Sequence, residues 1–108
     1  MTEALVVLVT APGAEEAARI ARALVEERLA ACGNVVPGLR SIYRWQGAVQ
    51  EDAEALLILK TTRDRFEALR ARVLALHPYE VPEVISLAVE AGSATYLDWI
   101  AKETKQVP

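Results

Sequence analysis

Two segments of this chain are hydrophobic at consecutive positions, and this feature constrains the fold most. Residues 5–9 read Leu-Val-Val-Leu-Val, and residues 55–59 read Ala-Leu-Leu-Ile-Leu. Short runs rich in β-branched and aliphatic residues are typical of β-strands. Because successive side chains of a strand point to opposite faces of a sheet, both faces of these strands are apolar. An open antiparallel sheet normally has one polar face, so something must cover the second face here.

Helical periodicity predicts three helices around these strands. The first is expected over residues 13–31, with Gly33 as a left-handed cap behind it. The second starts at residues 61–64, where a Thr hydroxyl and an Asp form a capping pattern, and it ends before Pro78. A short third helix follows Gly92-Ser93.

Extended segments fill the spaces between the helices. Residues 34–45 are expected to form a strand that Pro37-Gly38 interrupts as a bend or bulge. Gln46-Gly47 is typical of a hairpin turn, and the return strand is expected to run to Lys60. The last long strand is expected over residues 84–90.

The resulting order is β-α-β-β-α-β-α within 108 residues, a length that fits one domain, residues 1–108. This order predicts an α+β fold: a ferredoxin-like β-α-β-β-α-β sandwich with an extra C-terminal helix. Both main helices then lie on one face of the sheet, and the terminal helix is too short to cover the other face. An apolar patch of that size marks an interface, so we expect self-association.

Composition excludes several classes of partner. The net charge is −3, and the 12 basic residues are scattered among 15 acidic ones. Nucleic-acid binding needs clustered Lys and Arg, so no nucleic acid is expected. No apolar run is long enough to cross a bilayer, so no membrane is expected either. The chain starts Met-Thr-Glu-Ala without the basic residues of a secretory signal, which favours the cytoplasm.

Few residues are suited to catalysis. The sequence has no nucleophile elbow, phosphate-binding glycine loop or metal-ligand cluster, and His77 is its one histidine. We therefore expect a protein that is not an enzyme and needs no cofactor. Cys32, the one cysteine, is expected at a helix C-terminus as a small buried residue, not as a reactive thiol.

His77 is the one candidate metal ligand with a nitrogen side chain. Its neighbours Tyr79, Glu80 and Glu83 add oxygen atoms, so contact with Cu(II) or another divalent cation is one interpretation and a structural histidine is the other. A strong copper site needs several nitrogen or sulfur ligands, so any binding is expected to be weak.

Two further pairs are candidates for ligand contact. Tyr43 and Trp45 lie beside the hairpin turn, where they serve either interface packing or a ligand platform. Lys60 and Thr61 lie between a strand and a helix start, where a cation and a helix N-terminus can meet a small anion. A solvated strand end is the alternative for this second pair.

Six stretches, taken together and in this order, resemble the CutA family of divalent-cation tolerance proteins. They are Thr10-Ala11-Pro12; Leu29-Ala30-Ala31-Cys32 with Asn34 and Pro37; Ser41-Ile42-Tyr43-Arg44-Trp45-Gln46-Gly47; Leu59-Lys60-Thr61; His77-Pro78-Tyr79-Glu80-Val81-Pro82-Glu83; and Tyr96-Leu97-Asp98-Trp99-Ile100. They span nearly the whole chain.

This resemblance implies a ferredoxin-like fold assembled as a homotrimer, similar in architecture to the PII signalling proteins. It also implies a link to tolerance of copper and other divalent cations, without an established enzymatic activity. Family residues associated with clefts between subunits are matched here by Cys32, Trp45, Gly47, Lys60, Thr61, His77, Pro78 and Tyr79. The cysteine and second histidine that some bacterial members use for copper are replaced by Val9 and Leu76.

These observations lead to one main hypothesis and one alternative. The main one is a trimeric, non-enzymatic protein of divalent-cation response, with PII-like signalling or binding of a small anionic ligand in clefts between subunits. The alternative is a protein that binds copper or another divalent metal directly, as a buffer or chaperone.

Overall fold

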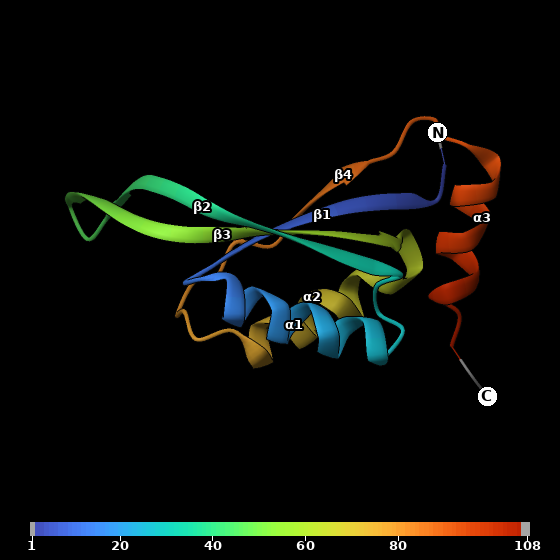
Figure 1. Ribbon diagram of the computed structural model, residues 1–108, viewed down its shortest axis with the longest axis horizontal. Helices are drawn as coiled ribbons and strands as arrows, with labels where there is room; N and C mark the ends of the chain where they lie inside the picture. Colours follow the sequence, from blue (N-terminus) through green and yellow to red (C-terminus); the bar gives the residue numbers. More distant parts are fainter. Residues whose placement is uncertain (1, 107–108) are drawn as a thin grey trace.

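A computed structural model describes residues 2–106, in which two helices cover one face of an antiparallel sheet (Figure 1). The strands are β1 (Ala4–Ala11), β2 (Cys32–Trp45), β3 (Ala48–Thr62) and β4 (Ile85–Ala88). The helices are α1 (Ala14–Glu26), α2 (Phe66–Leu76) and α3 (Ala94–Glu103), with a 3₁₀ turn over Arg63–Arg65 before α2. The sheet order is β2-β3-β1-β4, with every neighbouring pair antiparallel. The predicted α+β class is confirmed.

The main core lies between the sheet and the layer of α1 and α2. The fully buried side chains that fill it come from the two central strands and both helices: Val7, Val9, Leu57, Leu59, Ile20, Leu24, Leu69 and Val73. These positions alternate along β1 and β3, as side chains of one sheet face must. The apolar residues that recur at helical spacing in α1 are therefore the ones that the helix buries against the sheet.

The first helix is shorter than predicted, because it ends at Glu26 and not at residue 31. Arg28 takes the left-handed conformation behind the helix, with φ 59°. The N–H groups of Leu29 and Ala30 bond back to the Leu24 carbonyl, a helix-ending arrangement that returns both residues to the core. The prediction for Gly33 as the cap was therefore wrong.

Gly33 instead lies in β2, where it permits α1 to approach the sheet closely. A Cβ atom there would come within 3.0 Å of both the Ala21 Cβ and a Leu59 methyl group. Any larger residue would push the helix away from the strand. Sequence reasoning recognised a glycine with a special role here but assigned it the wrong one.

Three other boundaries differ from prediction. The return strand β3 continues to Thr62, and the capping pair expected over residues 61–64 does not form. The Thr62 hydroxyl donates to the Asp64 carboxylate at 2.6 Å, and a 3₁₀ turn precedes α2. Strand β4 covers only Ile85–Ala88, at the edge of the sheet beside β1.

A bulge in β2 sets which residues face which side of the sheet. Val36 pairs with Leu56, but the next pair is Leu39 with Glu54, so β2 carries one extra residue at Pro37-Gly38. This bulge confirms the predicted interruption, and Gly38 has φ 82°. Since one extra residue reverses the alternation, odd-numbered residues from 39 onward share the face that Val36 occupies.

The second face of the sheet carries no helix layer. Across this open face the register aligns three rows: Cys32, Lys60, Val6 and Leu87; Asn34, Ile58, Leu8 and Ile85; and Val36, Leu56 and Thr10. Helix α3 packs at one end of the sheet through Ile100, beside β1, and leaves most of this face uncovered (Figure 1). Two-sided apolar strands are thus observed, as the sequence predicted.

The distal parts of β2 and β3 form an arm that projects beyond the helices (Figure 1). Ile42 and Val49 on this arm are 67% and 64% exposed. The Gln46-Gly47 turn at its tip has positive φ at both residues, as a tight hairpin requires, and confirms the prediction. A lone two-stranded hairpin is marginally stable in water, so the arm needs other contacts.

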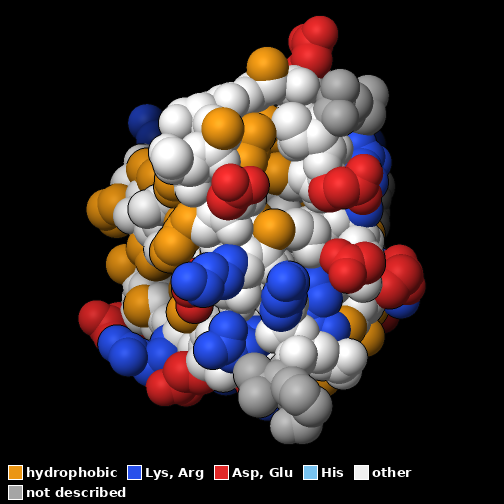
Figure 2. Space-filling view, turned by 90° about the vertical axis from the view of Figure 1, so that its right-hand side faces the viewer, with side chains coloured by type: hydrophobic (Ala, Val, Ile, Leu, Met, Phe, Trp, Pro, Cys, Tyr) orange, Lys and Arg blue, Asp and Glu red, His pale blue; other side chains and the backbone are white. Residues whose placement is uncertain are grey.

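Exposed apolar side chains also reach the end of the molecule that carries α3. Tyr96 and Trp99, whose rings stack with centroids 5.6 Å apart, are 43% and 39% exposed. Figure 2 shows this end, with hydrophobic side chains gathered along one side and Lys and Arg gathered below them next to acidic groups. Within residues 2–106, no helix is long and apolar enough to cross a membrane.

Candidate functional site

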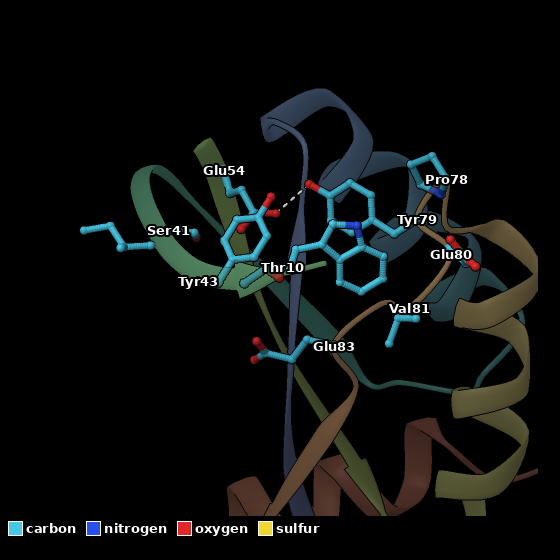
Figure 3. Close-up of a pocket in the computed structure, with 11 residues that line it drawn as sticks. Thr10, Ser41, Tyr43, Glu54, Pro78, Tyr79, Glu80, Val81 and Glu83 are labelled. Atoms are coloured by element: carbon cyan, nitrogen blue, oxygen red, sulfur yellow. Dashed lines mark hydrogen bonds between the residues drawn. The ribbon is translucent and has the colours of Figure 1, made fainter. Parts of the chain in front are cut away.

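A hollow with converging polar groups lies where the hairpin arm leaves the sheet. It has a volume of about 660 Å³, within the usual range of small-molecule pockets. One wall comes from β1 and the open face of the arm, and the other comes from the loop between α2 and β4 (Figure 3). The lining residues are Thr10, Ser41, Ile42, Tyr43, Trp45, Glu54, Pro78, Tyr79, Glu80, Val81 and Glu83.

Two tyrosine hydroxyls in this pocket donate to carboxylates. Tyr79 donates to Glu54 at 2.5 Å, and Tyr43 donates to Asp52 (Figure 3 shows the first bond). Burial, then the hydrogen bond and negative charge of Glu54, raise the pKa of Tyr79 far above its usual range. The bond to Asp52 likewise raises the pKa of Tyr43. Both phenols therefore stay protonated at physiological pH and cannot serve as bases there.

His77 fastens the pocket loop to the sheet. Its Nδ1 accepts the backbone N–H of Tyr79 at 3.1 Å, so Nε2 carries the proton and donates to the Thr10 carbonyl at 2.7 Å. The imidazole is 7% exposed, and its ring centroid lies 4.6 Å from that of Tyr79. Both nitrogens are engaged, so a metal ion would have to replace one of these hydrogen bonds.

Cys32 and Lys60 lie together at the other end of the open face. They are direct cross-strand partners in β2 and β3. The Lys60 ammonium donates to the Asn34 side chain, and the Cys32 sulfur lies 3.7 Å from the Tyr96 hydroxyl of α3. Cys32 begins a strand and is partly exposed, so its predicted place at a buried helix end was wrong.

Thr61 does not join Lys60, contrary to the sequence-based expectation. Its hydroxyl is fully buried on the helix-covered face and donates to the Leu29 carbonyl at 2.7 Å. Successive strand residues point to opposite faces, so Lys60 and Thr61 cannot contact one small ligand. The hydroxyl of Thr61 instead holds the segment behind α1 against β3.

Six of the candidate residues from the sequence thus line one pocket: Tyr43, Trp45, Pro78, Tyr79, Glu80 and Glu83. Sequence reasoning missed Glu54, because its approach to Tyr79 depends on the path of a loop far away in sequence. The exposed acidic stretch of β3 before the apolar run was the one available signal.

The pocket can bind but has no evident catalytic machinery. Ser41 and Thr10 are its aliphatic hydroxyl side chains, and neither hydroxyl has a hydrogen bond to a basic side chain among the interactions of the described residues, since His77 bonds to the backbone carbonyl of Thr10. No group of three or more His, Cys, Asp or Glu side chains in residues 2–106 is arranged to hold a metal ion. The arrangement suits non-covalent recognition by aromatic rings and carboxylates.

Similarity to known proteins extends over almost the whole chain. Residues 5–103 match the family described as CutA1 divalent ion tolerance protein. The divalent-cation tolerance protein CutA of Thermus thermophilus is 60% identical over 99 residues, which cover 92% of this chain and 96% of that protein. The chloroplastic protein CutA 1 of Oryza sativa is 47% identical over 102 residues, 94% of this chain but 58% of the rice protein.

Solved structures agree. The divalent cation tolerance protein (Cut A1) of Thermus thermophilus superposes with a TM-score of 0.92 at 58% identity, covering 94% of this chain and 99% of that one. The family comprises tolerance proteins with no known catalytic activity, in agreement with the expectation from the sequence. Profile, relatives and three-dimensional structure all lead to one assignment: this chain belongs to the CutA1 divalent ion tolerance protein family.

Proposed function

We propose that this protein acts in the response to divalent cations as a homotrimer of ferredoxin-like subunits that bind ligands in clefts between them. The observation that carries the proposal is the open apolar face of the sheet. Ile85 and Leu87 of β4 are 51% and 54% exposed there, beside the partly exposed Leu8 and Ile58. Contiguous apolar surface of this kind marks a protein interface.

The projecting arm supports the same proposal. Ile42 and Val49 on the arm lack an intrachain core, and contact with neighbouring copies would bury them. The element order and the sheet order β2-β3-β1-β4 support the ferredoxin-like classification. A closed ring of three copies buries three equivalent faces without leaving an open edge.

Light scattering on the purified chain tests the assembly. The expected mass is about three times the 11.8 kDa of one chain. A soluble monomer that persists at micromolar concentration would overturn the proposal.

Ligand binding in clefts is the second part of this proposal, with PII-like signalling as its outcome. The candidate cleft residues are Cys32, Tyr43, Trp45, Lys60, His77, Tyr79 and Glu80. Thr61 is buried on the opposite, helix-covered face of the sheet. A small anion is proposed at Lys60, whose side chain lies on the open face beside Cys32. Thermal-shift screening of anionic metabolites tests this, with Lys60→Met as the variant that should lose the response.

The cytoplasmic location expected from the sequence stays a prediction. The rice relative is named chloroplastic, so the relatives do not favour one compartment for this chain.

Direct copper binding is the alternative, and we propose that it is weak. His77 is the one imidazole, and both of its nitrogens already have hydrogen-bond partners. Calorimetry with Cu(II) on the wild type and on His77→Ala tests this, with micromolar affinity or weaker expected, falling further at low pH. Nanomolar binding that the substitution abolishes would put the metal-buffer function first.

A further inference from the structure

The pocket between the hairpin arm and the α2–β4 loop has an unusual lining for a protein proposed to bind anions. Three aromatic side chains, Tyr43, Trp45 and Tyr79, share it with three carboxylates, Glu54, Glu80 and Glu83. None of the described residues that line it is a Lys, Arg or His. The local charge is therefore negative.

We propose that this pocket binds a small organic cation of the alkylammonium class. The inference rests on the ligand-binding part of the proposed function and names the ligand class for this one pocket. Ring faces of Trp and Tyr attract ammonium groups through their quadrupole, and quaternary ammonium compounds are recognised in aromatic cages of this composition. The surrounding carboxylates add Coulombic attraction.

The tyrosine hydrogen bonds favour a cation over an anion. Each hydroxyl proton is already donated to a carboxylate, Tyr79 to Glu54 and Tyr43 to Asp52. The phenols have no second proton to offer an anionic ligand. What they present to the pocket is the ring, and Tyr43, Trp45 and Tyr79 keep 41%, 39% and 36% of their surface exposed.

The spacing of the carboxylates favours an organic cation over a bare metal ion. A hard divalent cation needs several oxygen atoms at 2.0–2.6 Å in one place. No such group of acidic side chains exists in the described part of the chain. In Figure 3, Glu54 lies beside Tyr43 while Glu83 lies on the far side of Thr10, so the acids are spread around the hollow. That distribution suits a bulky cation of diffuse charge.

The pocket shape is held in place before any ligand arrives. His77 bonds to the backbone of both Tyr79 and Thr10, and the Tyr79–Glu54 bond ties the loop to β3 across the hollow. A cavity of about 660 Å³ exceeds the needs of a metal ion and suits an ammonium group with an organic substituent.

Ligand-observed NMR titration of the full chain tests the inference with three compounds of matched shape. Choline is the cation, 3,3-dimethylbutan-1-ol is its uncharged carbon analogue, and 3,3-dimethylbutanoate is the anion. Choline is expected to bind with Kd of about 1–10 mM, as its small size allows. The alcohol should bind at least about tenfold more weakly, and the anion should show no saturable binding.

Three variants localise the effect. Trp45→Leu should weaken choline binding about fivefold or more, and Glu83→Gln about threefold. Glu26→Gln makes the same change of charge at the C-terminal end of α1, outside the pocket lining, and should leave choline binding unchanged. Absence of saturable choline binding, equal binding of choline and the alcohol, or insensitivity to Trp45→Leu would each overturn the inference.

Light scattering on the same samples separates this inference from the proposed assembly. Trimers that do not bind choline would overturn the ligand class alone. Monomers that bind choline selectively would overturn the assembly and leave the pocket inference standing.

Discussion

The two faces of the sheet have similar hydrophobic side chains but differ in how far these are buried. On the helix-covered face, Leu57 and Leu59 are completely buried by α1 and α2. On the open face, Leu56 and Ile58 from the same strand are only partly covered, and Ile85 is 51% exposed. The comparison teaches that one apolar run in a strand can serve two different partners: the chain's own helices and, we propose, other copies of the chain.

Placing the same negative charge at either of two neighbouring residues, Leu57 or Ile58, should have the largest effect on folding and assembly. Leu57→Asp places a carboxylate in the sealed core, at a cost of several kcal/mol that a small domain cannot offset. Ile58→Asp places it on the open face, where the single chain can hydrate it. We expect circular dichroism to show an unfolded Leu57→Asp variant, and light scattering to show a folded but dissociated Ile58→Asp variant.

Two outcomes would contradict this distinction between the faces. If Ile58→Asp unfolds as completely as Leu57→Asp, both faces belong to one core. If it remains a trimer, the open face is not the interface. Ile58→Val is the control, with a cost of about 1 kcal/mol or less expected in urea unfolding.

Removing the His77 imidazole, which joins the pocket loop to β1, should have the next largest effect on the free energy of unfolding. His77→Ala deletes the hydrogen bonds to Tyr79 and Thr10 and leaves the Thr10 carbonyl without its donor. We expect a loss of about 2 kcal/mol in urea unfolding at fixed protein concentration. Glu80→Gln, an exposed change in the same loop, should stay within about 0.5 kcal/mol of the wild type. Equal stability of both variants would refute this role of His77.

Thiol labelling can report whether the open face is covered in solution. Cys32 is partly exposed in the single chain, in the same face as Ile58. If neighbouring copies cover that face, the assembled wild type should react slowly with a thiol reagent. The dissociated Ile58→Asp variant should react about tenfold faster, in keeping with control of reactivity by access. Rapid labelling of a wild-type trimer would place Cys32 outside the interface.

The smallest expected effect concerns Tyr79 at alkaline pH. Burial and Glu54 raise the pKa of this phenol in the folded state above its ordinary value of 10.0. The folded chain thus holds the proton where the unfolded chain releases it, so this contribution to stability is present below pH of about 10 and is lost as pH rises further. The melting temperature of the wild type should fall toward that of Tyr79→Phe as the pH rises above about 10. A constant difference between them would contradict the shift.

Particular residues show how far sequence reasoning reached. The apolar run at residues 55–59 predicted a strand with two apolar faces, and Gln46-Gly47 predicted the hairpin tip, because both signals are local. Gly33 was misassigned, because its role is a 3.0 Å approach of α1 that depends on packing. Cys32 was misplaced for a related reason: the chain turns after Glu26 to bury Leu29 and Ala30.

The pocket shows most clearly which features follow from local sequence and which depend on packing. Aromatic residues beside the turn and the segment from His77 to Glu83 were identifiable as candidates from sequence alone. Their meeting depends on the bulge at Pro37-Gly38, which brings Tyr43 and Trp45 to the open face in place of Arg44.

By itself, the sequence determined the α+β class, the order of the elements, the shortage of catalytic groups and the need for a second covering on the sheet. These follow from periodicity and composition, which are properties of neighbouring residues. Only the tertiary structure decided that Thr61 is buried while Lys60 faces the opposite side, and that Glu54 meets Tyr79. Such contacts depend on strand register and loop path, which join residues distant in sequence and are set by how the whole chain packs.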